Sequence, residues 1–183
     1  REVVNELFDY PREHDQYVFK HQRPNIVFVI LESWAAEGIG CLSNAKGATP
    51  HFDALAQDGL LFTKVYATGH TSEIGNSSLF SGQPSLPEIA ITLQPEKHRK
   101  LRCFNQDLKK WGYRSHYLFG GDLKYGNIGS YFTDHGFDVL ADEDKPVSAF
   151  LVGIPILKVA IEDHVHGVVN IFLGCCARMA HTY

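Results

Sequence analysis

The stretch that most constrains the fold is an unbroken apolar run that ends on a carboxylate. Residues 26–31 read Ile-Val-Phe-Val-Ile-Leu, and Glu32 follows at once. Such a run is typical of a strand buried on both faces of a parallel sheet. Because burying an acid is costly, an acid at this point indicates the sheet edge, where α/β proteins bind their ligands. Glu32 is therefore the first candidate for chemistry; the alternative is a solvated loop residue just past a core strand.

Length and composition allow one domain, or part of a larger one, and exclude several classes of protein. The chain has 183 residues, of which 44% are hydrophobic and 21% charged, which is ordinary for a globular protein. A net charge of −4 without a basic block argues against nucleic-acid binding. The longest apolar runs are too short to span a bilayer. The start at Arg1, with no signal peptide, indicates an excised or processed segment.

The cysteines form no metal or redox motif. They stand at Cys41, Cys103, Cys175 and Cys176, and no C-x-x-C pattern occurs. This argues against a zinc knuckle or a thioredoxin-type site. We expect the four side chains to be small buried hydrophobes.

Strand and helix patterns alternate along the chain after a polar lead-in helix or linker over residues 1–23. This alternation predicts an α/β fold with a mainly parallel sheet sandwiched by helices. The predicted strands are Ile26–Leu31, Leu60–Tyr66, Ser115–Phe119 and Val168–Cys175. The predicted helices are His51–Asp58, Gly75–Ser81, Cys103–Trp111 (with Phe104, Leu108 and Trp111 inward), Asn127–Thr133 and Ile156–Asp163.

Several motifs follow one another in a fixed order along the chain. They are Pro24–Trp34, Ala48–Ala56, Gly59–Thr63, Tyr66–Gly75 running into Leu79–Gly82, Asp107–Tyr113, Gly120–Asp122, Gly136–Asp138 and Gly153–Pro155. Together these motifs resemble the lipoteichoic acid synthase and phosphoglycerol transferase family, within the alkaline phosphatase and sulfatase superfamily. The resemblance implies an alkaline-phosphatase-like fold, here incomplete, with residues 24–183 as the N-terminal part of the catalytic domain.

The family resemblance implies a metal-dependent phosphotransferase. A divalent metal, Mn or Zn, would be held by carboxylates and a histidine, with Glu32 as its first ligand. A hydroxyl nucleophile bound to the metal would have a lowered pKa, attack phosphorus and form a covalent phospho-enzyme. An alcohol or water would then accept the group.

Two adjacent hydroxyls compete for the nucleophile position. The family usually has threonine, but counting back from Phe80-Ser81-Gly82 places Ser72 there and Thr71 just before it. We favour Ser72, which would also be a metal ligand, and keep Thr71 as the second candidate. Either would lie at a helix N-terminus, whose dipole favours a developing anion. The alternative is that Ser72 only caps the following helix.

The substrate-binding part departs from the family pattern. Family members that transfer glycerol phosphate carry a tryptophan and an arginine after the Gly-Asp unit, and these positions are Gly126 and Ile128 here. The substrate-binding candidates that remain are Asp122, Lys124 and His181. The Lys124 ammonium cannot replace the bidentate guanidinium of the family's arginine. For His181 the alternative is a polar residue near the chain end without a role in binding.

The family's remaining metal ligands, an Asp-His pair and a further acid, have no convincing match. Asp134-His135, Asp163-His164 and His166 have suitable side chains, but we expect solvated loop histidines at all three places. Because a divalent site needs more ligands than Glu32 and Ser72, the chain resembles the first part of a catalytic domain. A truncated non-catalytic remnant is the alternative.

The function expected from the resemblance is transfer of a phospho-alcohol headgroup at the extracytoplasmic face of a bacterial membrane. The partner would be a phospholipid-type or phospho-alcohol substrate, and membrane attachment would come from a segment before Arg1. The alternative within the superfamily is a sulfatase or phosphodiesterase. Sulfatases with a C/S-x-P-x-R motif carry a proline and an arginine that the stretch starting at Ser72 lacks.

Overall fold

The computed structural model describes residues 24–85, 88–143 and 169–176. Its strands are β1 (Ile26–Leu31), β2 (Tyr113–Leu118), β3 (Val139–Ala141) and β4 (Val169–Cys176). Its helices are α2 (Pro50–Asp58), α3 (Ser72–Ser81), α4 (Pro95–His98), α5 (Phe104–Lys110) and α6 (Ile128–Asp134). Short 3₁₀ turns cover η1 (Ala36–Gly38), η2 (Gly40–Leu42), η3 (Ile91–Leu93) and η4 (Tyr125–Asn127).

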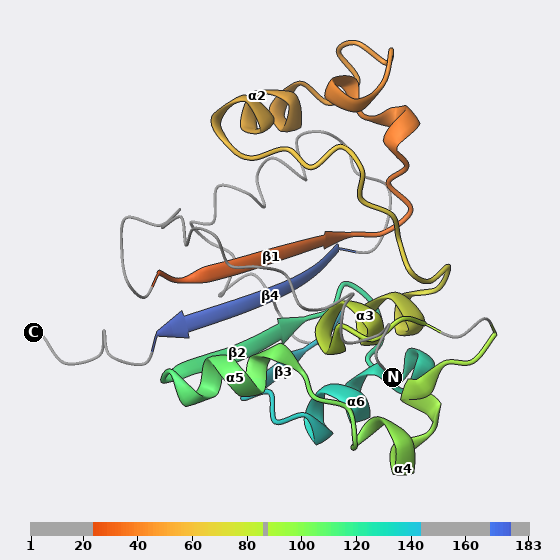
Figure 1. The fold of residues 1–183 in the computed structure, drawn as a ribbon, viewed down its shortest axis with the longest axis vertical. Helices are drawn as coiled ribbons and strands as arrows, with labels where there is room; N and C mark the ends of the chain where they lie inside the picture. Colours follow the sequence, from red (N-terminus) through yellow and green to blue (C-terminus); the bar gives the residue numbers. More distant parts are fainter. Residues whose placement is uncertain (1–23, 86–87, 144–168, 177–183) are drawn as a thin grey trace, which may run out of the picture.

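The described strands form one sheet in the order β1-β4-β2-β3 (Figure 1). β2 and β3 are parallel, and β4 is antiparallel to both β1 and β2. β1, β2 and β3 therefore share one direction, and β4 runs between them the opposite way. As a result, the segments that follow β1 and β2 leave the sheet at the same end, beside α3 (Figure 1).

β1 begins and ends where the sequence predicts, but it is not buried on both faces. It lies at an edge of the described sheet, and its side chains are half-buried, with Phe28 39% exposed. The apolar run correctly predicts a strand, because β-branched residues favour one. Burial depends in addition on what covers the strand.

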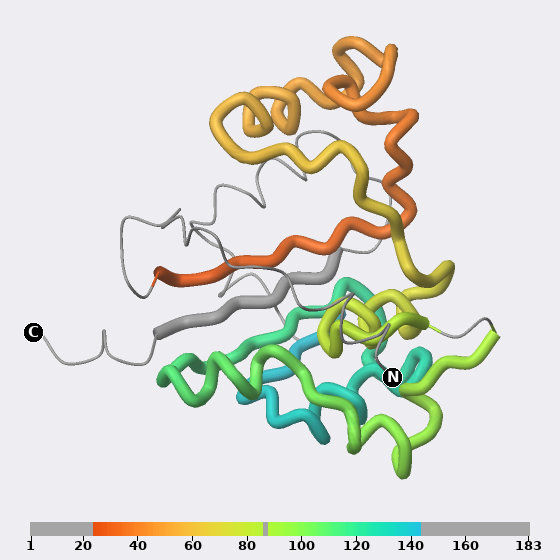
Figure 2. The backbone as a smooth tube through the Cα atoms, viewed as in Figure 1, coloured from red at the N-terminus to blue at the C-terminus, as the bar shows by residue number. Residues whose placement is uncertain are grey.

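The prediction of a strand over Leu60–Tyr66 is wrong. These residues form an irregular segment that returns the chain from α2 to α3 (Figure 2). Phe62, Val65 and Tyr66 are 72%, 74% and 83% exposed. A strand requires a neighbour for its backbone hydrogen bonds, and no described strand pairs with this segment.

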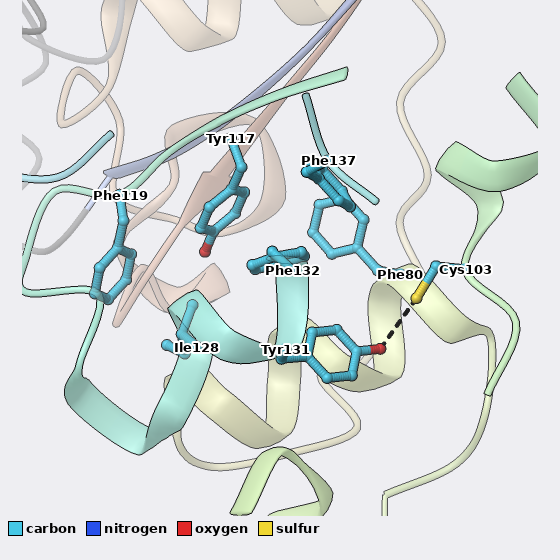
Figure 3. Packing of buried hydrophobic residues seen from close by; sticks show 8 residues of the cluster. All are labelled: Phe80, Cys103, Tyr117, Phe119, Ile128, Tyr131, Phe132 and Phe137. Carbon is cyan, nitrogen blue, oxygen red and sulfur yellow. Dashed lines mark hydrogen bonds between the residues drawn. The ribbon is translucent and has the colours of Figure 1, made fainter. Parts of the chain in front are cut away.

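The core lies where α3, α5 and α6 pack near β2 (Figure 3). Phe80 of α3 is 1% exposed and is in ring contact with Phe104 at 5.0 Å, Phe132 at 4.9 Å and Phe137 at 5.6 Å. Edge-to-face and offset ring contacts of this kind stabilise a core beyond the area that they bury. The full cluster is Phe80, Cys103, Tyr117, Phe119, Ile128, Tyr131, Phe132 and Phe137.

The sequence predicts buried side chains at Trp111 and Cys41, and both predictions are wrong. Trp111 is 63% exposed, because α5 ends at Lys110 and the next residue leaves the helical face. Cys41 is exposed, whereas Cys103 is fully buried as expected. Burial raises the pKa of the Cys103 thiol to about 11, so this sulfur acts as a small hydrophobe. The predicted helix Ile156–Asp163 and the side chains of Cys175 and Cys176 lie outside the described residues.

The Phe80→Ala substitution should destabilise the protein by about 3–5 kcal/mol, because it leaves a cavity among packed rings. The matched control is Leu79→Ala, since the neighbouring side chain is 49% exposed and surface truncations cost about 0.5 kcal/mol or less. Urea denaturation followed by circular dichroism measures both. Equal losses for the two variants would show that Phe80 is not at the centre of the core.

Candidate active site

Glu32 follows β1 at the end of the sheet that also receives the N-terminus of α3. It is partly buried, and the next residue, Ser33, has a φ of 56°. A positive φ is uncommon for a residue other than glycine and is enriched at functional sites. The chain therefore turns sharply just after the carboxylate.

The two hydroxyl candidates have different surroundings. Ser72 Oγ donates a hydrogen bond of 2.8 Å to Glu32 Oε2, across 40 positions of sequence. Thr71 Oγ1 is buried and has no hydrogen-bond partner among the described residues. The reading of Ser72 as a helix cap is wrong, because Thr71 occupies the N-cap position and Ser72 is the first residue of α3.

A cavity of about 340 Å³ opens around this pair. β1, the loop before α3, α3 itself and η4 all contribute to its lining. No lysine or arginine lines it within the described part of the chain. The polar side chains that do are Glu32, Ser33, His70, Thr71, Ser72, Asn76 and Tyr125.

The electrostatic potential around the cavity is negative because of Glu32 and Glu73. The Glu73 carboxylate beside Tyr125 raises the pKa of that phenol, with smaller contributions from burial and from Glu32. Burial, and then the charge of Glu32, raise the pKa of Tyr117 in the core below. A pocket with such a field does not attract an anion by itself. A bound cation would reverse the sign of the field.

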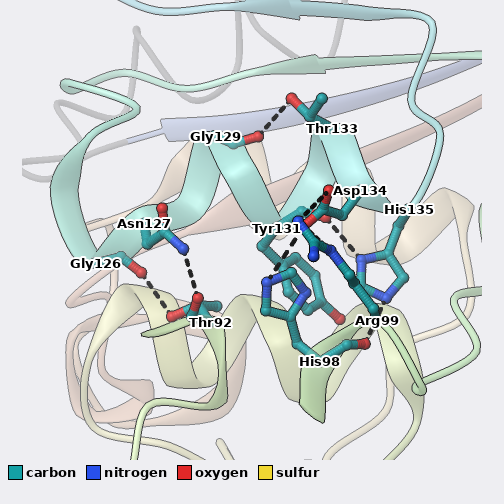
Figure 4. A network of polar contacts seen from close by, with 10 residues as sticks. All are labelled: Thr92, His98, Arg99, Gly126, Asn127, Gly129, Tyr131, Thr133, Asp134 and His135. Carbon is teal, nitrogen blue, oxygen red and sulfur yellow. Dashed lines mark hydrogen bonds and ion pairs between the residues drawn. The ribbon is translucent and has the colours of Figure 1, made fainter. Parts of the chain in front are cut away.

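Tyr125 reaches the cavity from a tightly held turn. Gly126 has a φ of 53°, and a Cβ built on it would lie 2.5 Å from Glu73 Cβ, so no larger residue fits there. Thr92 is 1% exposed, and its Oγ1 donates a hydrogen bond of 2.6 Å to Gly126 O (Figure 4). The carbonyl oxygen of Thr92 accepts a hydrogen bond of 2.7 Å from Asn127 Nδ2. These contacts fix the turn that carries the half-exposed Tyr125 ring.

The positions of the family's tryptophan and arginine take no part in the cavity. Gly126 has no side chain, and Ile128 is fully buried in the core. The aromatic side chain at the cavity instead comes from the adjacent Tyr125.

The two substrate-binding candidates that the structure describes lie outside the cavity. Asp122 and Lys124 are exposed, and neither lines the cavity. Asp122 Oδ1 accepts 2.8 Å from the Lys124 backbone N–H, an Asx turn that starts η4. His181 lies outside the described residues.

His135 is buried rather than solvated, which corrects the sequence expectation. Its Nδ1 lies 2.7 Å from Tyr131 O and its Nε2 3.0 Å from His98 O (Figure 4). Asp134 pairs with Arg99 at 2.9 Å. Burial lowers the pKa of His98, and Asp134, 3.5 Å away, opposes that effect. These side chains pack α4 against α6 and do not form a metal site. Asp163-His164 and His166 lie outside the described residues.

The described residues supply only part of a metal site. Glu32 Oε2 and Ser72 Oγ lie 2.8 Å apart and are both hard oxygen donors, of the kind that divalent cations use. No cluster of three or more His, Cys, Asp or Glu suited to a metal occurs within the described residues. A complete site would need further donors.

Asn76 and Tyr125 are pocket residues that the sequence interpretation missed. Asn76 is 4% exposed, and its Oδ1 is buried without a partner in the described structure. Its spacing of four from Ser72, one turn of helix on the same face, was a usable signal. Tyr125 carried no such signal, because η4 breaks the helical pattern at Gly126.

The comparisons with known proteins agree on one superfamily. The family model described as Sulfatase matches residues 24–150. A phosphoglycerol transferase I of Xanthomonas euvesicatoria pv. vesicatoria is 44% identical over 137 residues, covering 67% of this chain and 18% of the relative. An ulvan-active sulfatase of Formosa agariphila is 30% identical over 92 residues, covering 50% of this chain and 18% of the relative.

A solved structure supports the same fold. A protein of the alkaline phosphatase superfamily from Vibrio parahaemolyticus superposes with a TM-score of 0.53 at 30% identity, covering 60% of this chain and 26% of the other. The α/β, alkaline-phosphatase-like fold expected from the sequence is thereby confirmed. The chain spans less than a fifth of the length of the two curated relatives that it matches.

The Thr92→Val substitution should destabilise the protein by about 1–2 kcal/mol, because it leaves the Gly126 carbonyl without its donor. Thr133→Val is the matched control: its hydroxyl donates 2.8 Å to Gly129 O, but at an exposed helix position, where loss of the bond costs about 0.5 kcal/mol or less. Denaturant unfolding compares the two. If Thr92→Val were no more costly than the control, the turn that carries Tyr125 would not depend on Thr92.

Proposed function

The chain belongs to the sulfatase family, and on that premise we propose that it is the N-terminal part of an enzyme that transfers a phospho-alcohol group. The hydrogen bond from Ser72 to Glu32 at the floor of the cavity is the observation that carries the proposal. It brings a hydroxyl at a helix N-terminus against a carboxylate, which is the arrangement of an activated nucleophile.

The residues have distinct roles in this proposal. Ser72 Oγ attacks phosphorus while its proton passes by way of Glu32 to the oxygen of the leaving alcohol, and the bond from phosphorus to that oxygen breaks. An acceptor alcohol or water then attacks the Ser72 phosphoester and releases the serine. The N-terminus of α3 stabilises the negative charge that builds up next to it. A divalent cation, Mn or Zn, would lower the pKa of the Ser72 hydroxyl and neutralise the incoming anion.

Phosphoryl transfer is favoured over sulfate ester hydrolysis by two observations. Sequence identity is higher to the phosphoglycerol transferases than to the sulfatases. Counted from Ser72, the proline and arginine positions of the C/S-x-P-x-R motif are Ile74 and Asn76. Both relatives are far longer, so the remaining metal donors and the acceptor site would come from the rest of a longer domain that begins near residue 24.

Localisation and membrane partners follow from the same premise. We propose a catalytic domain at the extracytoplasmic face of a bacterial membrane, acting on a phospholipid-type or phospho-alcohol substrate. No helix in the described part of the chain combines the length and apolar character of a membrane span, so attachment would rely on a segment outside it.

The Ser72→Ala variant should lose covalent ³²P labelling from phosphatidylglycerol with a labelled headgroup phosphate, because the attacking oxygen is gone. Thr71→Ala should keep the labelling, since Thr71 Oγ1 makes no hydrogen bond with Glu32 in the described structure. Acid-stable label on the tryptic peptide that contains residue 72 is the measurement. The reverse pattern would move the nucleophile to Thr71, and no label in either variant or the wild type would contradict a phospho-enzyme.

The Glu32→Gln variant should bind Mn²⁺ at least about tenfold more weakly than the wild type, because a charged oxygen donor is replaced by a neutral amide. Titration calorimetry with manganese alone measures this. Glu37→Gln is the matched control, since Glu37 lies five residues further on in the exposed turn η1. Equal affinity in all three proteins would remove Glu32 from the metal site and favour the non-catalytic remnant.

A further inference from the structure

Asn76 lies one helical turn beyond Ser72 and lines the same cavity. It is 4% exposed, and its Oδ1 is wholly buried, with no hydrogen-bond partner in the described part of the chain. Leaving a buried polar atom unpaired costs about 1–3 kcal/mol, and native structures rarely do so. An apolar residue would avoid this cost, so the retained amide points to a ligand that completes the bond.

The chemistry of the atom restricts that ligand. A carbonyl oxygen accepts hydrogen bonds and cannot donate them. The oxygens of a phosphodiester are acceptors too, so they cannot satisfy Asn76 Oδ1. A free hydroxyl on the alcohol part of the substrate can, whereas a cation on Oδ1 would give no preference between headgroups with and without that hydroxyl. Thr71 Oγ1, the other unpartnered atom in the cavity, is less informative, because a hydroxyl can both donate and accept.

The spacing fits a small polyol. Four residues of α-helix rise about 6 Å, a separation comparable to that between the phosphorus of a phosphoester and a hydroxyl two or three carbons away. Tyr125, 53% exposed at the same cavity, supplies an aromatic side chain for contact with the carbon chain between them. The walls would then contact each part of the headgroup: Ser72 the phosphorus, Tyr125 the carbons and Asn76 the hydroxyl.

We propose that Asn76 is a specificity-determining residue that binds a free hydroxyl of a polyol phosphate headgroup through Oδ1. This proposal rests on the proposed function, since it takes Ser72 as the residue that faces phosphorus. It goes further by assigning recognition of the free hydroxyl to one side chain of this chain.

The test compares glycerol 3-phosphate with ethyl phosphate, which has a similar charge and no free hydroxyl on carbon. Binding to the full chain is measured by calorimetry with manganese present. The wild type should bind glycerol 3-phosphate about 5- to 10-fold more tightly, the effect of one buried hydrogen bond. Asn76→Leu should abolish this preference by weakening glycerol 3-phosphate alone. Asn76→Asp, which keeps an acceptor oxygen of the same shape, should retain the preference while binding both probes more weakly.

Each other result overturns the proposal in a recognisable way. An equal loss of both probes in Asn76→Leu would mean that the amide contacts the anion through its nitrogen. An unchanged preference in Asn76→Leu would place the hydroxyl elsewhere. Ser72→Ala should keep the preference, so a wild-type preference without covalent labelling would contradict only the proposed chemistry. Failure of the wild type to bind either probe would contradict both proposals.

Discussion

The packing of Phe80 among the core rings determines where the chemistry can occur. Phe80 lies on α3, and Ser72 and Asn76 lie eight and four residues before it. Because residues four apart stack on one face of a helix, this face carries a core anchor at one end and pocket side chains at the other. The rings of α5 and α6 that enclose Phe80 therefore also set the position of Ser72 against Glu32.

The second constraint is electrostatic. Glu32 lies at the cavity and Glu73 beside Tyr125, their charges raise the pKa of Tyr125, and no lysine or arginine lines the cavity within the described residues. An anionic substrate would be repelled by such a site, so a cation has to be part of the function that we propose. Ser72 Oγ and Glu32 Oε2 lie 2.8 Å apart. These two oxygens would be donors for that cation.

Structure that depends on the local sequence is predicted correctly, whereas structure that depends on contacts with other parts of the chain is not. The predicted bounds of β1 agree with the structure to the residue, because a run of β-branched side chains by itself favours a strand. Leu60–Tyr66 has the same local preference but lacks a described strand to pair with, so it stays irregular. The resemblance places His135 in solvent because Gly136-Phe137-Asp138, which follows it, is a surface turn in the family, yet its ring nitrogens lie against the carbonyl oxygens of Tyr131 and His98. The contact with His98 spans 37 residues and leaves no periodic signal in the sequence.

The packing around the cavity explains why Gly126 and Ile128 depart from the family pattern. At Gly126 the close approach of Glu73 leaves no room for a side chain, and Ile128 is needed in the core, so neither position can supply a headgroup contact. Tyr125 presents its ring one residue earlier, held by the bonds of Thr92 to the turn. With a neutral amide at Asn76 and a phenol at Tyr125, the described walls of the cavity provide hydrogen-bonding groups and an aromatic side chain instead of a fixed positive charge. Recognition of the alcohol would then come from this chain and charge neutralisation from a cation, which divides affinity and specificity between two sources.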